Sequence, residues 1–110
     1  MKKIVAVTAC PTGIAHTYMA AEMLEKASKA LGIKIKVETN GLIGVENRLT
    51  STDIQEADAI IIAADANVEM KRFDGKPLIE VSVTEGIKNA KALVEDACLG
   101  KYPIYHAKHE

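Results

Sequence analysis

The sequence predicts an α/β protein, a Rossmann-like three-layer αβα sandwich whose sheet has four parallel strands in the order 2-1-3-4. Two observations lead to this prediction. Short apolar runs alternate along the chain with segments of helical periodicity, which is typical of βαβ units with right-handed crossovers. The second run also alternates with lysines, as edge strands do, so we place it outside the first strand. A chain of 110 residues suffices for one domain with its own core.

Each expected element follows from a local pattern. The four strands are short apolar runs, at residues 3–8, 33–38, 59–64 and 78–83. The amphipathic segments are expected to be helices, at residues 14–31, 52–57 and 84–99. Thr52 and Gln55 fit a capping box, Thr84 fits the N-cap of the last helix, and Gly32 and Gly100 fit left-handed positions after helices.

Composition excludes several classes of protein. The formal net charge of −1 argues against a nucleic-acid binder held by phosphate contacts, and an aromatic content of 4% argues against base stacking. No apolar run approaches the ~20 residues that span a bilayer, and none fits a signal peptide. With only two cysteines, the chain fits a cytoplasmic protein with reduced thiols. We expect a monomer.

The loop after the first strand is the first candidate site, because ligands of such sheets bind where the strand order reverses. Cys10 lies at the end of a buried strand, and the next residues lead directly into a helix. We expect a phosphate-binding cradle in this loop, formed by the backbone N–H groups of Thr12, Gly13, Ile14, Ala15, His16 and Thr17. The Thr12, His16 and Thr17 side chains are additional donors. The helix N-terminus should lower the Cys10 pKa from about 8.5 into the range of roughly 3.5–7.5.

Other interpretations of the loop fit less well. Cys10 could simply be a small buried residue at the end of a strand, since cysteine is often buried. A nucleotide P-loop would need a Gly-Lys-Ser/Thr ending, and a dinucleotide fold would need G-x-G-x-x-G; neither is present. Cys10 and His16 provide too few ligands for a metal site. We therefore expect neither a metal nor a cofactor, and favour a thiolate nucleophile that faces a cradled phosphoryl group.

The sequence resembles the fructose-family enzyme IIB component of the bacterial phosphoenolpyruvate-dependent sugar phosphotransferase system. Four stretches carry the resemblance: IVAVTACPTGIAHTYMAAEML, KVETNG, ADAIIIAAD and RFDGKP. The resemblance implies that residues 1–100 form the IIB domain and residues 101–110 a C-terminal tail. It also implies a phosphocysteine at Cys10, within the cradle formed by the loop from Thr12 to Thr17.

The resemblance further implies an activity and its partners. Cys10 would accept a phosphoryl group from a phosphohistidine of the IIA component. It would then pass the group to fructose, or a fructose-like sugar, bound by the membrane IIC component during uptake. The protein would be a cytoplasmic phosphotransferase that associates transiently with the inner face of the cell membrane through IIC. The residues fit this chemistry, since a thiolate is both a nucleophile and a fair leaving group.

Two alternatives stay open from the residues. Low-molecular-weight tyrosine phosphatases have a loop of Cys, five residues, Arg, then Ser or Thr; here Cys10 is followed after five residues by His16 and Thr17, so the arginine is missing. Asp65 could serve such a phosphatase as general acid, or could simply cap a loop. The second alternative is a non-catalytic module that binds anions at the helix N-terminus.

A rim around Cys10 is the expected docking face for IIA. The predicted partner-contact residues are Pro11, Tyr18, Asp65, Asn67 and Arg72. Cys98 near the end of the last helix is expected to serve packing, because helix C-termini disfavour a thiolate. His106 lies in the tail, which we expect to be frayed.

Overall fold

The computed structural model describes residues 2–11, 15–41 and 44–106. Their elements alternate between strands and helices, as the sequence predicts. In chain order they are β1 (Lys3–Ala9), α1 (Ala15–Ala30), β2 (Lys34–Gly41), β3 (Gly44–Glu46), α2 (Ser51–Glu56), β4 (Ala59–Ala64), the 3-10 helix η1 (Lys71–Phe73), β5 (Leu78–Val81), α3 (Val83–Lys88) and α4 (Ala90–Cys98). Within the described ranges, no helix is both long enough and apolar enough to cross a membrane.

The sheet has five strands in the order β3-β2-β1-β4-β5. Four of them, β2, β1, β4 and β5, are parallel neighbours. The predicted count of four and the predicted order 2-1-3-4 were therefore wrong, because β3 adds an antiparallel edge strand next to β2. The mostly parallel α/β architecture is confirmed.

The additional strand β3 had no apolar signal in the sequence. It has three residues, all exposed, and pairs only with the carboxyl end of β2, where Thr39 lies opposite Glu46 and Gly41 opposite Gly44. Gly44 has a φ of 110°, a conformation that residues with a side chain rarely adopt. The hairpin follows from this backbone freedom rather than from burial, so hydrophobic periodicity could not reveal it.

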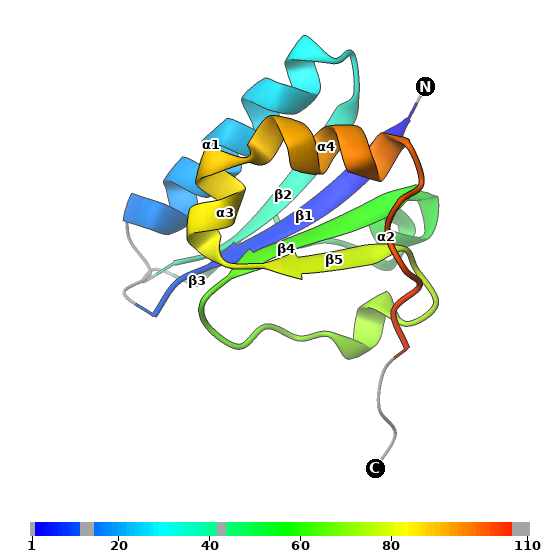
Figure 1. The fold of residues 1–110 in the computed structure, drawn as a ribbon. Coiled ribbons are helices and arrows are strands. Elements are labelled where there is room, and N and C mark those ends of the chain that lie inside the picture. The colour runs from blue at the N-terminus through cyan, green and yellow to red at the C-terminus, as the bar shows by residue number, and fades with distance from the viewer. Residues whose placement is uncertain (1, 12–14, 42–43, 107–110) are drawn as a thin grey trace.

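The sheet separates two apolar clusters, which gives three layers (Figure 1). On one face, α1 and α4 pack against Ile4, Ala6 and Ile61. On the other face, α2 and η1 pack against Val5, Val7 and the neighbouring side chains of β4. The strands alternate strictly between these two faces, as the period of two requires. β1 contributes to both clusters, and its residues 4–9 are fully enclosed.

Several helix boundaries differ from the predictions. The capping box of α2 uses Thr50 and Asp53, not Thr52 and Gln55, since the side chain of Thr50 accepts from the Asp53 N–H and that of Asp53 from the Thr50 N–H. The helix expected at 84–99 is two helices that meet at Asn89, whose φ of −118° and ψ of 28° interrupt the helix. Ser82, not Thr84, is the N-cap of α3.

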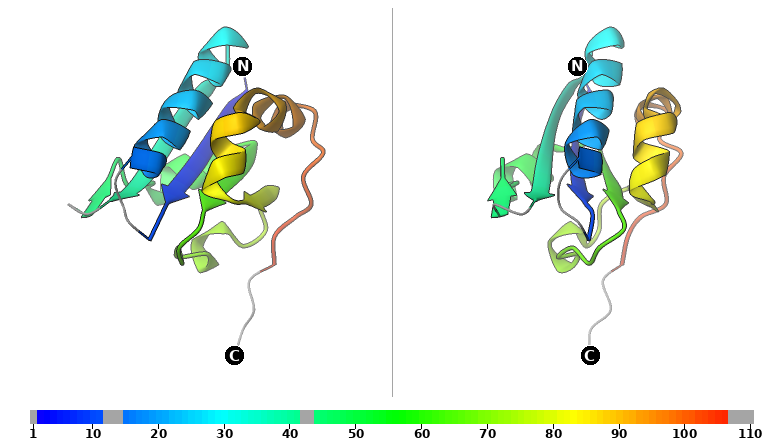
Figure 2. Two further views of the ribbon diagram at one scale, coloured as in Figure 1. Left: turned by 60° about the vertical axis from the view of Figure 1, so that its left-hand side comes forward. Right: turned by 90° about the vertical axis from the view of Figure 1, so that its left-hand side faces the viewer.

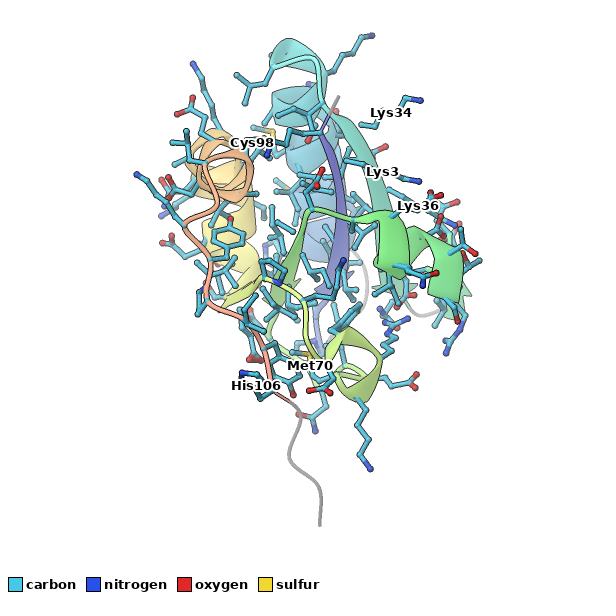
Figure 3. All side chains as sticks on the ribbon, turned by 90° about the vertical axis from the view of Figure 1, so that its right-hand side faces the viewer. Lys3, Lys34, Lys36, Met70, Cys98 and His106 are labelled. Atoms are coloured by element: carbon cyan, nitrogen blue, oxygen red, sulfur yellow. The ribbon has the colours of Figure 1, made fainter. Side chains whose placement is uncertain are left out.

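The side of β1 and β2 that faces α2 is lined by charge pairs. Lys3, Lys34 and Lys36 project together from these two strands (Figure 3). Lys3 binds Glu56 at 2.7 Å, and Lys36 binds Asp53 at 2.7 Å. The Lys36 ammonium is the main cause that lowers the pKa of Asp53 to about 2. Lys36, one of the lysines that predicted an edge strand, thus has an acidic partner on a short helix.

The start of the predicted tail packs against the domain. Residues 101–106 run beside the beginning of β5, where the Leu78 N–H donates to the carbonyl of Pro103 at 2.9 Å and Ile104 bridges Pro77. Tyr102 is 7% exposed, and its hydroxyl donates to the carbonyl of Leu93 at 2.5 Å. The expectation of a frayed segment was wrong for these residues, because Tyr102 adds to the core beneath α4. His106 is exposed at its end (Figure 3).

Helix α3 lies close to the sheet because of one glycine. A Cβ on Gly86 would lie 2.7 Å from the Cβ of Ala63 and 3.6 Å from the Cβ of Ala20. Ala63 is near the carboxyl end of β4, and Ala20 is in the second turn of α1. Gly86 therefore sets the distance between α3 and the strand ends around which the candidate site is built.

We expect Gly86→Ala to lower the free energy of unfolding by about 1–3 kcal/mol, as overpacked core substitutions do. The added methyl group must displace Ala63 or move α3 outward, which more than offsets the gain in helix propensity. Urea unfolding followed by circular dichroism measures the change. Thr84→Ala, at an exposed position of the same helix, serves as the control. Equal stability of Gly86→Ala and the wild type would contradict the close packing.

Candidate active site at the end of the central strand

Cys10 directly follows β1, which has a hydrogen-bonded neighbour on each side. Figure 2 (right) looks toward the carboxyl ends of the strands, where β1 ends near the beginning of α1. The Asp65 N–H donates to the Ala9 carbonyl at 2.9 Å, and the Asn40 side-chain amide donates to the Thr8 carbonyl at 3.4 Å. The ends of β4 and β2 are thus tied to β1 on both sides of the half-buried Cys10.

The predicted cradle is only partly within the described residues. Thr12, Gly13 and Ile14 lie outside them, so the expected contacts of their N–H groups stay predictions. Ala15 and His16 begin α1 and are exposed, as is Pro11 before them. Thr17 is fully buried in the first turn of α1.

The core changes from apolar to polar in the layer beneath Cys10. On the α1 face of the sheet, Ile4 pairs with Ile35, and Ala6 pairs with Val37. The next layer toward the site pairs Thr8 with Thr39, and both threonines are buried. The strand alternation places them on the same face as the apolar pairs, beneath α1.

In the part of the chain that the structure describes, two hydroxyls near the site are buried without a hydrogen-bond partner. They belong to Thr8 in β1 and Thr17 in α1, and Ser28, farther along α1, has a third. A buried hydroxyl without a partner costs roughly 1–3 kcal/mol. Native proteins leave few such groups, and those that remain call for an explanation. Thr17 is one of the predicted cradle residues, whereas Thr8 is not, because its only signal in the sequence is a hydroxyl at the end of an apolar run.

Asp65 caps the neighbouring helix. Its Oδ1 accepts a hydrogen bond from the Val83 N–H at 3.1 Å, at the first turn of α3. Of the two roles considered for Asp65, the structure thus supports loop capping. Asn67, two residues farther on, is exposed in the segment that follows β4.

Tyr18 connects the start of α1 to the edge strand. Its side chain is 37% exposed, and its hydroxyl donates to Glu46 Oε1 at 2.9 Å. This hydrogen bond is the main cause that raises the Tyr18 pKa. The aromatic ring therefore has a fixed direction on the surface beside the candidate site.

Arg72 is engaged by an ion pair within the domain. Its Nη1 and Nη2 donate to the two carboxylate oxygens of Glu38 at 2.8 and 2.6 Å, and its guanidinium lies 4.7 Å from the ring centre of Phe73. The Leu49 N–H adds a third donor to Glu38, at 2.9 Å. A bidentate ion pair engages the guanidinium and leaves the Arg72 side chain 14% exposed. The expected contact of Arg72 with a partner stays a prediction.

The protonation of Glu38 follows from opposing effects. Burial is the largest and would raise the pKa of its carboxyl. The hydrogen bonds from Arg72 and Leu49, together with the charge of Arg72, outweigh burial, so the pKa lies below its ordinary value of 4.5. Glu38 was not among the predicted site residues, since its partner Arg72 lies 34 positions away in the sequence. The ion pair fastens η1 and the segment before α2 to β2.

Cys98 lies at the opposite end of the sheet from Cys10. It lines a groove of about 370 Å³ with Leu31, Ile33 and Leu99, close to the beginning of β2. Burial is the main cause that raises the pKa of its thiol. These properties fit the packing role expected for Cys98. Among the residues that the structure describes, no three His, Cys, Asp or Glu side chains gather as a metal site.

Comparison with known sequences assigns the class of protein. The family model "PTS system, Lactose/Cellobiose specific IIB subunit" matches residues 5–96. The chain belongs to this IIB family of the sugar phosphotransferase system, and its role is phosphoryl transfer in sugar uptake.

The similar curated proteins are of the fructose type. The chain is 55% identical over 103 residues to the "PTS system fructose-specific EIIABC component" of Bacillus subtilis (strain 168). That match covers 94% of this chain and 16% of the Bacillus protein. It is 50% identical over 95 residues to the "PTS system fructose-like EIIB component 2" of Escherichia coli (strain K12), covering 86% of this chain and 90% of that protein.

Solved structures share the fold. A domain of fruA from Bacillus subtilis is 53% identical, with a TM-score of 0.89 over 94% of this chain and 99% of that one. A domain of the fructose-specific IIABC component from Borrelia burgdorferi is 43% identical, with a TM-score of 0.89 over 94% of this chain and 98% of that one.

We expect the Glu38 carboxylate to make the free energy of unfolding depend on pH in the acid range. Its folded pKa is below that of the unfolded chain, so its contribution is complete above pH 4.5 and is lost as the pH falls through the folded pKa. Glu38→Gln should flatten the loss of unfolding free energy below pH 4.5. At pH 7 it should cost about 3–5 kcal/mol, because it leaves Arg72 without its charged partner.

Urea unfolding at a series of pH values measures both effects. Glu69→Gln is the matched control, since Glu69 is exposed and binds Arg48 at 3.1 Å in the same neighbourhood. Its effect should stay within about 0.5 kcal/mol. If Glu38→Gln and Glu69→Gln behaved alike at both ends of the pH range, the role given to the buried ion pair would be wrong.

Proposed function

We propose that the chain is a fructose-type phosphoryl carrier in which Cys10 carries the phosphoryl group. The donor is a phosphohistidine of a IIA component, and the acceptor is fructose, or a fructose-like sugar, bound by a membrane IIC component. Family membership and the fructose-type relatives support the pathway. The position of Cys10 at the carboxyl end of the central parallel strand, before α1, carries the assignment of the residue.

The transfer consists of two displacements at phosphorus. The Cys10 thiolate attacks the phosphoryl group, the S–P bond forms, and the N–P bond to the donor imidazole breaks. In the second step a sugar hydroxyl attacks the same phosphorus, the O–P bond forms, and the S–P bond breaks to release the thiolate. The hydroxyl proton leaves to a base on the acceptor side. Donors at the start of α1 would stabilise the phosphoryl oxygens in both steps.

The phosphatase alternative has less support. Such an enzyme needs a bidentate arginine at the loop position that His16 occupies, and Arg72 is bound to Glu38. A phosphatase must hydrolyse its phosphocysteine, whereas a phosphoryl carrier must not activate water against it. The anion-binding alternative shares the loop with the carrier and differs from it only in chemistry, so experiment must separate them.

The partners and the location follow from the proposed pathway. The Bacillus relative is named as an EIIABC component, and the chain spans only 16% of it, so the IIA and IIC functions reside in separate proteins or in further domains of one chain. We place the domain in the cytoplasm, in transient contact with the membrane through IIC. We propose a monomer without cofactor or metal.

The IIA docking rim would comprise Pro11, Tyr18, Asp65 and Asn67, which are exposed around the carboxyl end of the sheet.

We expect incubation with phosphoenolpyruvate, the general phosphotransferase proteins and a IIA partner to add one phosphoryl group to the wild type. Cys10→Ser should gain none, whereas Cys98→Ser should gain the same amount as the wild type, because Cys98 lies at the other end of the sheet. Intact-mass spectrometry reads the adduct. An adduct on Cys10→Ser, or none on the wild type together with hydrolysis of an aryl phosphate, would reject the carrier assignment.

We expect Tyr18→Ala to slow phosphorylation by the donor roughly tenfold, since exposed aromatic side chains often anchor interfaces. Rapid-quench measurement of the adduct at a series of donor concentrations determines the rate. Lys29→Ala, exposed at the other end of α1, should leave the rate unchanged. Unchanged rates in both variants would remove Tyr18 from the docking rim.

A further inference from the structure

We propose that the Thr8 hydroxyl forms the deep wall of the phosphoryl site and donates a hydrogen bond to the phosphoryl group on Cys10. Thr17, on the opposing helix, would supply a second donor. The inference rests on the proposed function and adds to it a residue of β1 that precedes the loop itself.

The position of Thr8 is the first argument. It lies near the carboxyl end of β1, two residues before Cys10, which directly follows the strand. At the rise of an extended backbone, two residues span about 7 Å. Below Thr8, on the same face, every described layer of the sheet is apolar. The change to hydroxyls therefore occurs only in the layer next to Cys10, where Thr8 lies beside Thr39 and beneath the first turns of α1.

The Thr8 hydroxyl is buried without a partner among the described residues. The side chain is 0% exposed, and its Oγ1 makes no hydrogen bond within residues 2–11, 15–41 and 44–106. Valine has the same shape and would fill this site in the strand without burying a polar atom. The hydroxyl therefore destabilises the unphosphorylated domain, and a role in another state of the domain accounts for it. Thr17 Oγ1, on α1, is also buried without a hydrogen-bond partner among the described residues.

The phosphoryl group is the partner that fits this donor. It brings three strong acceptor oxygens and negative charge to the sulfur of Cys10. Hydrogen bonds to charged acceptors are roughly twice as strong as neutral ones, and they are stronger still where water is excluded. A threonine hydroxyl donates without losing its proton, so it binds the group without activating water against the S–P bond.

Three substitutions separate this role from ordinary packing. Thr8→Val removes the hydroxyl and keeps the shape, while Thr8→Ser keeps the hydroxyl and removes a methyl group. Ser28→Ala is the matched control, because Ser28 is also buried without a partner but lies about 16 Å farther along α1 than Thr17. The readouts are the midpoint of urea unfolding and the phosphorylated fraction at equilibrium with the phosphorylated donor.

We expect Thr8→Val to raise the unfolding midpoint of the unphosphorylated protein and to lower the equilibrium constant for phosphorylation about tenfold or more. Thr8→Ser should unfold more easily yet keep phosphorylation close to that of the wild type. Ser28→Ala should be phosphorylated like the wild type. This opposite ordering of stability and phosphorylation in the two Thr8 variants is not expected of a packing residue.

Two results would overturn the inference. One is a wild-type equilibrium constant in Thr8→Val. The other is equal loss in Thr8→Val and Thr8→Ser, which would assign the effect to packing. If Thr8→Val failed to fold, a parallel fall of stability and phosphorylation in Thr8→Ser would reject the hydroxyl role. A wild type that gains no phosphoryl group would instead reject the proposed function, independently of Thr8.

Discussion

The site depends on the enclosure of β1 between two strands and two helical layers. Its backbone is hydrogen-bonded on both sides, and its residues 4–7 pack into the two apolar clusters in alternation. The point at which the chain leaves the sheet is therefore fixed, and Cys10 is the first residue beyond it. The contacts of Asp65 with Ala9 and Val83 extend this constraint to β4 and α3. The proposed nucleophile thus directly follows a rigid strand.

Hydrophobic periodicity was sufficient for the elements that bury apolar side chains. It predicted the parallel strands and α1, because residues such as those of 59–64 have no stable alternative to the core. It failed where polar contacts decide the structure. β3 is fully exposed, the cap of α2 depends on a choice between neighbouring threonines, and the break at Asn89 has no local signal. Tyr102 was predicted to lie in a polar tail, because its packing against α4 requires the fold.

For the candidate site, the sequence predicted the position of Cys10 better than the contacts around it. Cys10 could be placed at the end of a buried strand because an apolar run directly precedes it, and the structure confirms this position. Its role as nucleophile stays a prediction. Arg72 and Glu38 could not be paired from sequence, since 34 positions separate them and each residue alone is typical of a surface. Thr8 was overlooked because threonine is also a common strand residue. The residues that were missed contribute through contacts between elements, and these require the fold.

The most direct test of the central claim is to locate the phosphoryl group on the phosphorylated wild type. Cleavage after Lys3 and Lys26 gives a peptide, residues 4–26, that contains both Cys10 and His16. We expect tandem mass spectrometry to place the group on Cys10, with a linkage that iodine cleaves, as expected of a bond to sulfur. A group on His16, or one that iodine leaves intact, would contradict the proposal that this domain carries phosphate on its thiol.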